Sequence, residues 1–408
     1  MINSIAWKNI WRNKLRSSVV IAAVTFGILA GVFSAGLMNG MVERRLRAAI
    51  ELETSNVQLH NPKYIENKEL TFAINNADGI IASLIKMPEV KAIAKRMKIM
   101  AMANTASSGT GVVVYGIEPE KEKLVSGIYK KILPGEGPYF ETDRKNSIVI
   151  GQKLAEKLKL KLKSKIVITL QTVDGMMVNA AFKVVGIYKT SNSMFDEMNI
   201  FVRYNDLANL TGFNEQNAHE IAILLNDTNL SDDVAQKLTK QFPNLDVMTW
   251  KEIQPDLGIT VEFLNIMLYF FVIIILLALG FGIVNTMLMV VLERIKELGM
   301  LMAVGMNKMR IFKMIMLETI YLSLTGGILG ITLGIILIQI FQQHGIDLSI
   351  YGEGFSAIGY DSMIYPSIGI DYYIGTFLLV ILTGIIASIY PARKALKLNP
   401  AEAVRTEI

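Results

Sequence analysis

The chain has 408 residues, of which 52% are hydrophobic and 19% are charged, and its formal net charge is +5. Soluble globular domains carry about a quarter charged residues, so a substantial part of this chain is suited to a non-aqueous setting. High apolar content and small net charge exclude an intrinsically disordered chain. The absence of cysteine excludes disulfide bonds, thiolate metal sites and thiol nucleophiles.

Four long segments contain no Asp, Glu, Lys or Arg, namely residues 17–42, 263–292, 319–346 and 372–392. A helix needs about 20 apolar residues to cross a bilayer. We therefore predict an α-helical membrane protein whose first transmembrane helix lies within residues 1–42. The other three are predicted at residues 263–292, 314–341 and 372–391, with Pro391 ending the last. The first segment is longer than the apolar core of a cleaved signal peptide, which has roughly 7–15 residues, so cleavage is the less favoured alternative.

The charges next to these segments predict the orientation. The N-terminal segment, the loop 293–313 and the tail 392–408 together carry 13 basic and 4 acidic residues, whereas the loop 342–371 has no Lys or Arg. By the positive-inside rule, both termini and the 293–313 loop are cytoplasmic. Arg44, Arg45 and Arg47, just outside the first span, oppose this assignment but are outnumbered.

The long insert after the first span holds 28 basic and 27 acidic residues over positions 41–262, so no nucleic-acid partner is expected. Its flanks, 43–111 and 213–262, each show a strand, a helix, a proline and a second strand. Two such units indicate ferredoxin-like halves, with chance similarity as the alternative. The middle, 112–212, is rich in strands, and Asp174-Gly175 between two apolar runs predicts a hairpin. We expect an α+β domain inserted between the first and second membrane helices.

Motifs for catalysis and cofactor binding are missing. No Gly-Lys pair occurs, which excludes a phosphate-binding loop of the GxxxxGK[ST] type, and no GxSxG turn occurs. His60, His219 and His344 lack metal-ligand spacing. We therefore expect no cofactor, no metal and no catalytic residue, although Ser, His and Asp residues could still assemble in space.

Inside the spans, small residues recur every four positions at Gly326, Gly330 and Gly334 in one helix and from Gly27 in another. This spacing favours close packing of helices. Glu318 is the one charged residue expected inside a span, where it could snorkel to the cytoplasmic border or cap a helix. A channel or ion-coupled carrier is therefore disfavoured.

The cytoplasmic loop is unusually apolar and predicts a short helix with Leu298, Leu301, Met302 and Gly305 on one face. Such a helix could lie at the membrane surface or fit a groove of a cytoplasmic partner. The tail sequence at 399–402, Asn-Pro-Ala-Glu, predicts the start of a second short helix.

Several sequences together resemble one family of membrane proteins. They are AWKNIWRNKLRS at the start, VVVYGIEPEKEKLVSGIY in the insert, ERIKELGMLMAVG in the loop and YPARKALKLNPAEAVR in the tail. They look like the FtsX/MacB-type ABC transporter permeases, with a MacB-like periplasmic core domain at residues 43–262. The resemblance implies an inner-membrane location, a cytoplasmic ABC ATPase dimer as partner, and a second permease copy or paralogue. It also implies that the chain relays force from the ATPase to the periplasm, and that the coupling helix includes Glu293, Glu297, Leu298, Gly299, Met302, Ala303 and Gly305.

Within this family, MNGMVERRLRAAI after the first span looks most like the lipoprotein-releasing permeases LolC and LolE. This implies a lipoprotein or other amphiphilic substrate, membrane lipid as a partner, and a periplasmic carrier or adaptor. The Asp174-Gly175 hairpin is shorter than the hook expected of the LolC type. The alternatives are a MacB-like export permease for peptides or drugs and an FtsX-like signalling scaffold that regulates cell-wall hydrolases. For lipid contact in an outer-leaflet cleft we expect the apolar residues Val32, Phe33, Leu37, Phe263, Leu264 and Met267.

Overall fold

The computed structural model describes residues 2–140 and 144–396, and the chain divides into two compact units. The helical unit contains the described residues among 1–41, 262–347 and 363–408. The α+β unit contains those among 42–261 and 348–362. The tail residues 399–402, where we predicted a helix, lie outside the described residues.

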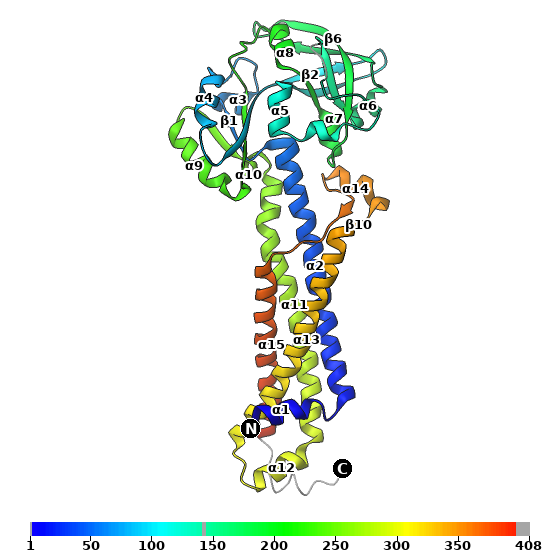
Figure 1. Cartoon of the computed structure of the whole chain (residues 1–408), viewed down its shortest axis with the longest axis vertical. Coiled ribbons are helices and arrows are strands. Elements are labelled where there is room, and N and C mark those ends of the chain that lie inside the picture. The colour runs from blue at the N-terminus through cyan, green and yellow to red at the C-terminus, as the bar shows by residue number, and fades with distance from the viewer. Residues whose placement is uncertain (1, 141–143, 397–408) are drawn as a thin grey trace. The chain divides into compact units, whose positions relative to one another are not determined.

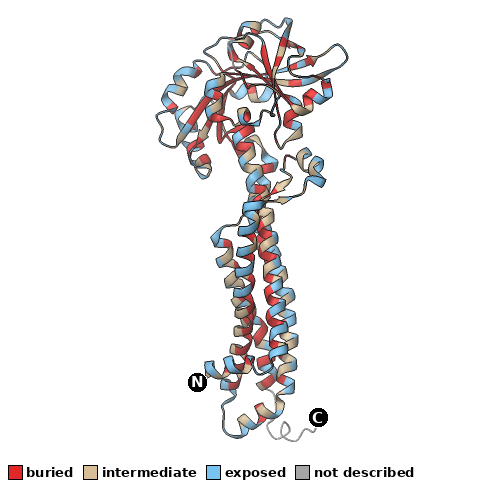
Figure 2. Cartoon of the chain, turned by 45° about the vertical axis from the view of Figure 1, so that its right-hand side comes forward, coloured by how far each residue is buried: buried red, intermediate tan, exposed pale blue. Residues whose placement is uncertain are grey.

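Four helices are long and apolar enough to cross a membrane (Figure 1). They are α2 (Lys14–Ala48), α11 (Pro255–Glu293), α13 (Lys308–His344) and α15 (Ile370–Leu396). The short helices α1 (Ile2–Ile10) and α12 (Ile295–Ala303) complete the helical unit. Figure 2 shows buried residues where the long helices face one another and exposed residues on their outer sides. Large apolar side chains such as Phe26 and Phe281 are among the exposed ones, which suits a lipid environment.

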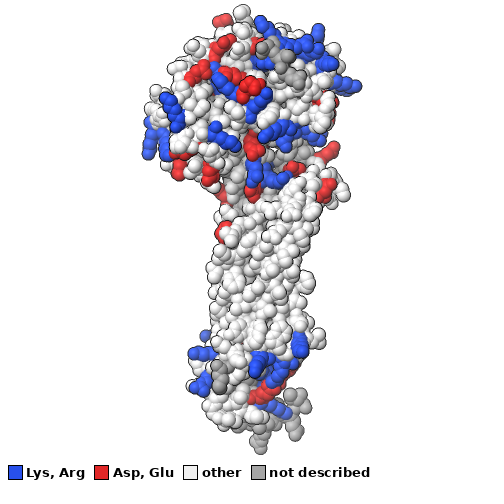
Figure 3. All heavy atoms as spheres, viewed as in Figure 1, with Lys and Arg blue, Asp and Glu red and all other residues white. Residues whose placement is uncertain are grey.

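The surface of these helices lacks Lys, Arg, Asp and Glu over a long stretch of the face drawn in Figure 3. One prediction about the helix ends is wrong, because Pro391 lies inside α15, which continues to Leu396. Proline removes one backbone hydrogen bond but does not have to end a helix that neighbouring helices support. Pro391 and Ala392 are both buried, which is consistent with such support.

Glycines let the membrane helices approach closely, as their spacing predicts. A Cβ atom on Gly330 of α13 would lie 2.7 Å from the carbonyl oxygen of Thr25 in α2. On another side of α2, a Cβ on Gly27 would lie 2.8 Å from a methyl group of Leu279 in α11. Helix α2 therefore packs against α11 and α13 through small residues.

The α+β unit is built on one sheet with strand order β3-β7-β4-β6-β5-β2-β8-β1-β9, and β2 also pairs with β3. The extra pairing closes the six strands β2 to β7 into a ring. Apolar side chains such as Ile148, Ile166 and Phe182 form a core cluster among these strands. The strands are β1 (Val57–His60), β2 (Val90–Asn104), β3 (Gly109–Ile117), β4 (Ser147–Gly151), β5 (Lys165–Gln171), β6 (Met177–Tyr188), β7 (Asn199–Arg203), β8 (Glu220–Leu225) and β9 (Asp246–Thr249).

The remaining strands form the order β2-β8-β1-β9, in which β8 lies between β2 and β1, the split β-α-β arrangement of ferredoxin-like folds. Their core includes Leu59, Leu84 and Leu238, with one residue each from β1, α4 (Ala77–Leu84) and α9 (Ser231–Gln241). Strand β2 serves both parts, because residues 90–96 pair with β8 and residues 96–104 pair with β3. The predicted boundary between residues 111 and 112 assigns all of β2 to the first ferredoxin-like half, although β2 is also one of the six strands that form the ring.

Short helices connect and cover these strands. They are the π-helix Ala49–Thr54, α3 (Pro62–Asn67), α5 (Pro119–Val125), α6 (Gln152–Leu158), α7 (Ser193–Met198), α8 (Tyr204–Thr211), α10 (Trp250–Ile253) and α14 (Gly352–Ala357).

The segment between the third and fourth long helices belongs partly to the α+β unit, a feature that the sequence did not reveal. We predicted residues 342–371 as a simple loop, but residues 348–362, which include α14, are part of this unit. Asp361 of this segment lies 3.6 Å from Arg44, and Gly359 packs against the guanidinium of Arg45.

Candidate functional site

A network of polar side chains joins α1, α12 and α13 in the helical unit. Arg294, between α11 and α12, lies 3.0 Å from a carboxylate oxygen of Glu297 and 3.3 Å from one of Glu318. Asn9 of α1 donates a hydrogen bond of 2.6 Å to Glu318. Glu318 is only 3% exposed, so it neither snorkels to the border nor caps a helix, and our expectation for it was wrong. The reason is that Asn9 and Arg294 supply donors inside the unit, so the carboxylate can be buried.

Two exposed ion pairs extend this network to the start of α2. The Arg12 guanidinium donates to both carboxylate oxygens of Glu297, at 2.9 and 2.5 Å. Arg16 makes the same two-bond contact with Glu293, at 2.5 Å for each bond. The hydrogen bond from Arg12 lowers the pKa of the Glu297 carboxyl. Exposed pairs contribute little stability, about 1 kcal/mol or less. The Arg12 pair links α12 to the segment between α1 and α2, and the Arg16 pair links α2 to the end of α11.

The residues predicted for the coupling helix do not share one exposed face. Glu293 ends α11 and Glu297 lies in α12, each paired as described. Leu298 and Gly299 are buried, Met302 is half-buried, and Ala303 and Gly305 are exposed. The apolar stripe is therefore turned partly inward, because periodicity shows a stripe but not which side packs against the unit, and the coupling role of these residues stays a prediction. The exposed apolar side chains of this region belong to Met300 and Val304, at 62% and 84% exposure.

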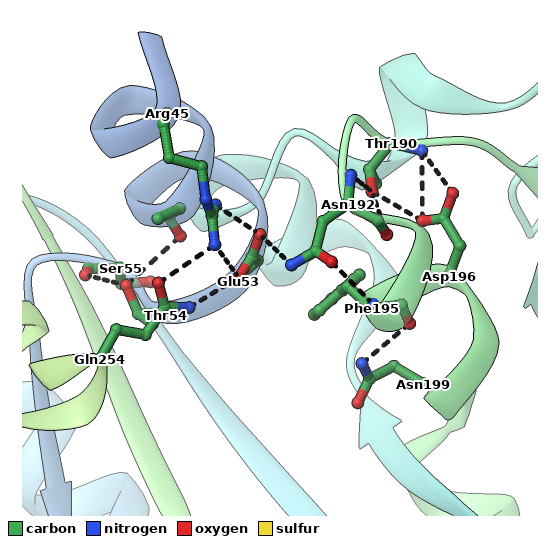
Figure 4. A network of polar contacts seen from close by, with 11 residues as sticks. Arg45, Glu53, Thr54, Ser55, Thr190, Asn192, Phe195, Asp196, Asn199 and Gln254 are labelled. Carbon is green, nitrogen blue, oxygen red and sulfur yellow. Dashed lines mark hydrogen bonds and ion pairs between the residues drawn. The ribbon is translucent and has the colours of Figure 1, made fainter. Parts of the chain in front are cut away.

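A second polar network lies in the α+β unit, where α2 gives way to the π-helix (Figure 4). Arg45 and Glu53 form an ion pair at 2.8 Å, and their side chains are only 10% and 7% exposed. Gln254, just after α10, donates to Glu53 at 2.6 Å. Asn192, just before α7, donates to the same carboxylate at 3.1 Å. Glu53 therefore holds together α2, the region before α11 and the ring of strands.

The loop before α7 is itself fixed by Asp196, which accepts hydrogen bonds from the backbone and hydroxyl of Thr190 (Figure 4). Burial raises the pKa of Asp196 to about 6, although the hydrogen bonds from Thr190 oppose this effect. Sequence analysis missed this network. The one signal was the unexplained group Arg44, Arg45 and Arg47, whose charges are paired with Asp361, Glu53 and Glu43.

Buried charges mark the strand that the two parts of the sheet share. Arg96 of β2 pairs with Glu220 at 2.7 Å and with Glu122 at 2.6 Å, and all three side chains are at most 3% exposed. Lys98 lies 2.9 Å from Glu220. Burial disfavours the charged carboxylate, but Lys98 and Arg96 outweigh it and lower the pKa of Glu220 to about 2. Removal of one member would leave an uncompensated buried charge, which is strongly destabilising.

His60 and His219, far apart in sequence, come together beside this cluster. The Nδ1 atom of His219 accepts from the backbone N–H of Lys98 at 3.1 Å, and its Nε2 lies 2.9 Å from the Leu70 carbonyl oxygen. His60 contacts the His219 carbonyl oxygen and the Gln58 side chain. Both nitrogens of each ring therefore lie within hydrogen-bond distance of a neighbouring group.

The six residues predicted for lipid contact do not form one surface. Val32 and Leu264 are buried, and Val32 packs against Gly334. Phe33 and Leu37 are half-buried, whereas Phe263 and Met267 are exposed. Asp174 and Gly175 lie in the loop between the paired strands β5 and β6, where Gly175 has a φ of +81°. Only glycine adopts this backbone conformation without strain.

The described chain thus combines four helices of membrane-spanning length with a nine-stranded α+β unit, and two family models match these two parts. The chain belongs to the family of proteins with a MacB-like periplasmic core domain, whose model matches residues 17–241. A second model, the FtsX-like permease C-terminal, matches residues 269–400. The predicted FtsX/MacB relationship is thus confirmed.

Several individual proteins are similar to this chain. The chain is 26% identical to an ABC transporter permease of Methanocaldococcus jannaschii, over 100% of this chain and 98% of that protein. It is also 26% identical to the pyoverdine export ATP-binding/permease protein PvdT of Pseudomonas syringae, over 98% of this chain but only 59% of PvdT. Among solved structures, the periplasmic region of MacB from Actinobacillus actinomycetemcomitans is 11% identical with a TM-score of 0.36. It covers 53% of this chain and 98% of the MacB region.

Proposed function

We propose that this chain is the force-transmitting permease subunit of an ABC complex whose ATP hydrolysis occurs in a separate cytoplasmic ATPase dimer. These 408 residues contain no phosphate-binding loop of the GxxxxGK[ST] type, which supports placing ATP hydrolysis outside them. In this proposal the chain lies in the inner membrane with both termini in the cytoplasm and residues 43–262 in the periplasm. A second copy or a paralogue completes the permease.

The observation that carries this proposal is the fixed attachment of α12 to the rest of the helical unit. Arg12 and Arg294 both bind Glu297 of α12, and Arg294 also binds the buried Glu318 of α13. A displacement of α12 by the ATPase would therefore act on α13 through Arg294 and on the segment between α1 and α2 through Arg12. Helices α2 and α11 continue without a break through residues 42 and 261, respectively, so movement in either helix can pass along its backbone.

For the substrate, we propose a lipoprotein or other amphiphile that is withdrawn from the outer leaflet towards an outer membrane. The support is the resemblance to LolC and LolE after the first span. Export of a small molecule through an adaptor is the second candidate. It is supported by PvdT, a relative that carries pyoverdine export in its name. An FtsX-like signalling role has no specific support from the described residues.

A co-purification experiment tests the ATPase partnership. Val304→Asp places a charge on the exposed end of α12, and we expect it to abolish co-purification with the partner ATPase. Ile350→Asp is the matched control, because Ile350 is 94% exposed but lies in the α+β unit. Normal ATPase recovery with Val304→Asp would contradict the coupling assignment. Mass spectrometry of ligands bound to the intact complex separates the substrates, since a triacylated lipoprotein supports the first candidate and a bound adaptor supports the second.

A further inference from the structure

We propose that a groove in the α+β unit binds the headgroup of an anionic phospholipid. The groove has a volume of about 720 Å³. Its walls are the end of α2 with the π-helix, the segment from α5 to the 3-10 helix Ile128–Lys131, and the residues around the end of β8. This volume lies in the range of small-ligand sites, about 300–1,000 Å³.

The groove concentrates positive charge in a unit that is otherwise balanced. Two acidic residues, Glu43 and Glu51, line it, against five basic residues, which are Arg47, Lys91, Lys123, Lys130 and Lys131. The excess is therefore 5 − 2 = +3, whereas positions 41–262 as a whole have 28 − 27 = +1. Charge of this density favours an anionic ligand.

Three of these ammonium groups are available for such a ligand. Within the described residues, Lys91, Lys130 and Lys131 form no ion pair, and the Lys130 ammonium lies 5.5 Å from the ring centre of Tyr129. The other two cations are engaged, Arg47 with Glu43 and Lys123 with Glu120, each at 2.8 Å. A phosphate offers several acceptor oxygens, so one headgroup can contact more than one lysine at once.

Apolar side chains beside the lysines suit a lipid rather than a free anion. Leu46, Leu52 and Leu124 line the groove, and Leu124 is 65% exposed among the basic residues. Leu46 and Leu124 can cover the glycerol and first methylenes of a lipid, because removing apolar surface from water is favourable.

The position of the groove along α2 also favours a lipid. The uncharged segment of this helix ends at residue 42, and Arg47 follows five residues later in the same helix. At 1.5 Å per residue this is about 7.5 Å, comparable to the depth of the headgroup layer outside the hydrocarbon core. Basic residues at this level attract anionic lipids.

Lipid titration of the purified full-length protein in neutral detergent tests the site. Short-chain phosphatidylglycerol and phosphatidylcholine are added separately, and bound lipid is measured by native mass spectrometry. We expect phosphatidylglycerol to bind at least tenfold more tightly than phosphatidylcholine, and Lys130→Gln/Lys131→Gln to remove this preference. The matched control is Lys161→Gln/Lys165→Gln, which removes the same charge from exposed lysines outside the groove.

Three outcomes would overturn the proposal. They are equal binding of the two lipids, an equal loss of preference in the control variant, and full displacement of phosphatidylglycerol by inorganic phosphate at the same concentration. The last result would identify a site for soluble anions. Unchanged thermal unfolding of both double variants shows that folding is preserved. If the groove is the site, Lys91→Gln should also reduce the affinity for phosphatidylglycerol, independently of the Lys130 and Lys131 substitutions.

Discussion

The close approach of α2 and α13 can be tested with a pair of Gly→Ala substitutions. A Cβ on Gly330 would lie 2.7 Å from the Thr25 carbonyl oxygen and 2.8 Å from the Ile28 Cβ, both on α2. The first of these atoms is backbone and cannot rotate away, so the helices have to separate. Gly282 of α11 is the matched control, because a Cβ there has no neighbour within 4 Å.

The expected magnitude follows from two opposing effects. Replacing Gly by Ala inside a helix stabilises it by about 1 kcal/mol, and this gain applies to both positions. Forcing an extra carbon into a packed interface costs about 1–3 kcal/mol, and this loss applies to Gly330→Ala alone. Gly282→Ala should therefore be stabilising by about 1 kcal/mol. Gly330→Ala should be less stable than Gly282→Ala by about 1–3 kcal/mol.

Thermal unfolding of the two purified variants and the wild type, in one detergent and at one protein concentration, measures this difference. Hydrogen exchange of residues 20–30 and 325–335 shows whether the loosening occurs where α2 meets α13. Equal melting temperatures for Gly330→Ala and Gly282→Ala would refute the packing argument, since both variants share the same propensity gain.

Three further predictions concern the polar groups. Arg45→Ala should destabilise the α+β unit by about 3 kcal/mol because it leaves the buried Glu53 charge without its cation. Unfolding of this unit can be followed by the fluorescence of Trp250 in a background of Trp7→Phe and Trp11→Phe. A loss of stability no larger than that caused by Arg44→Ala, which removes one partner of an exposed ion pair, would count against this prediction. Asp196 has a pKa of about 6 when folded, against an ordinary value of 3.8. The folded state therefore binds the extra proton between these pH values, and the free energy of unfolding should fall by about 3 kcal/mol as pH rises through that window. The difference between wild type and Asp196→Asn across pH 4–7 measures this effect, and parallel curves would disprove it. Glu297→Arg should reduce the stimulation of the partner ATPase while changing the free energy of unfolding by about 1 kcal/mol or less. Adding Arg12→Glu should restore ATPase stimulation, because the ion pair then forms with its charges reversed. If the double variant does not recover ATPase stimulation, the pair has no role in coupling.

Local sequence determines much of this protein. Uncharged segments such as 263–292 identify membrane helices, because a bilayer of fixed thickness demands a minimum apolar length. The four-residue spacing of Gly326, Gly330 and Gly334 predicts a close helix contact, because one helical face repeats at that spacing. The family resemblance is also readable from local segments, and the family models confirm it.

Tertiary structure alone decided which groups meet. Glu318 is buried because Asn9, 309 positions away in the chain, supplies a hydrogen bond, and no local pattern contains that information. The sequence shows Arg45 as a charge that opposes the predicted orientation, and only the structure shows that it pairs with Glu53. Periodicity gave α12 an apolar stripe, yet only packing showed that Leu298 faces inward and Val304 outward. Side-chain spacing fixes the faces of a helix, whereas the partner of each face depends on contacts between residues distant in the chain.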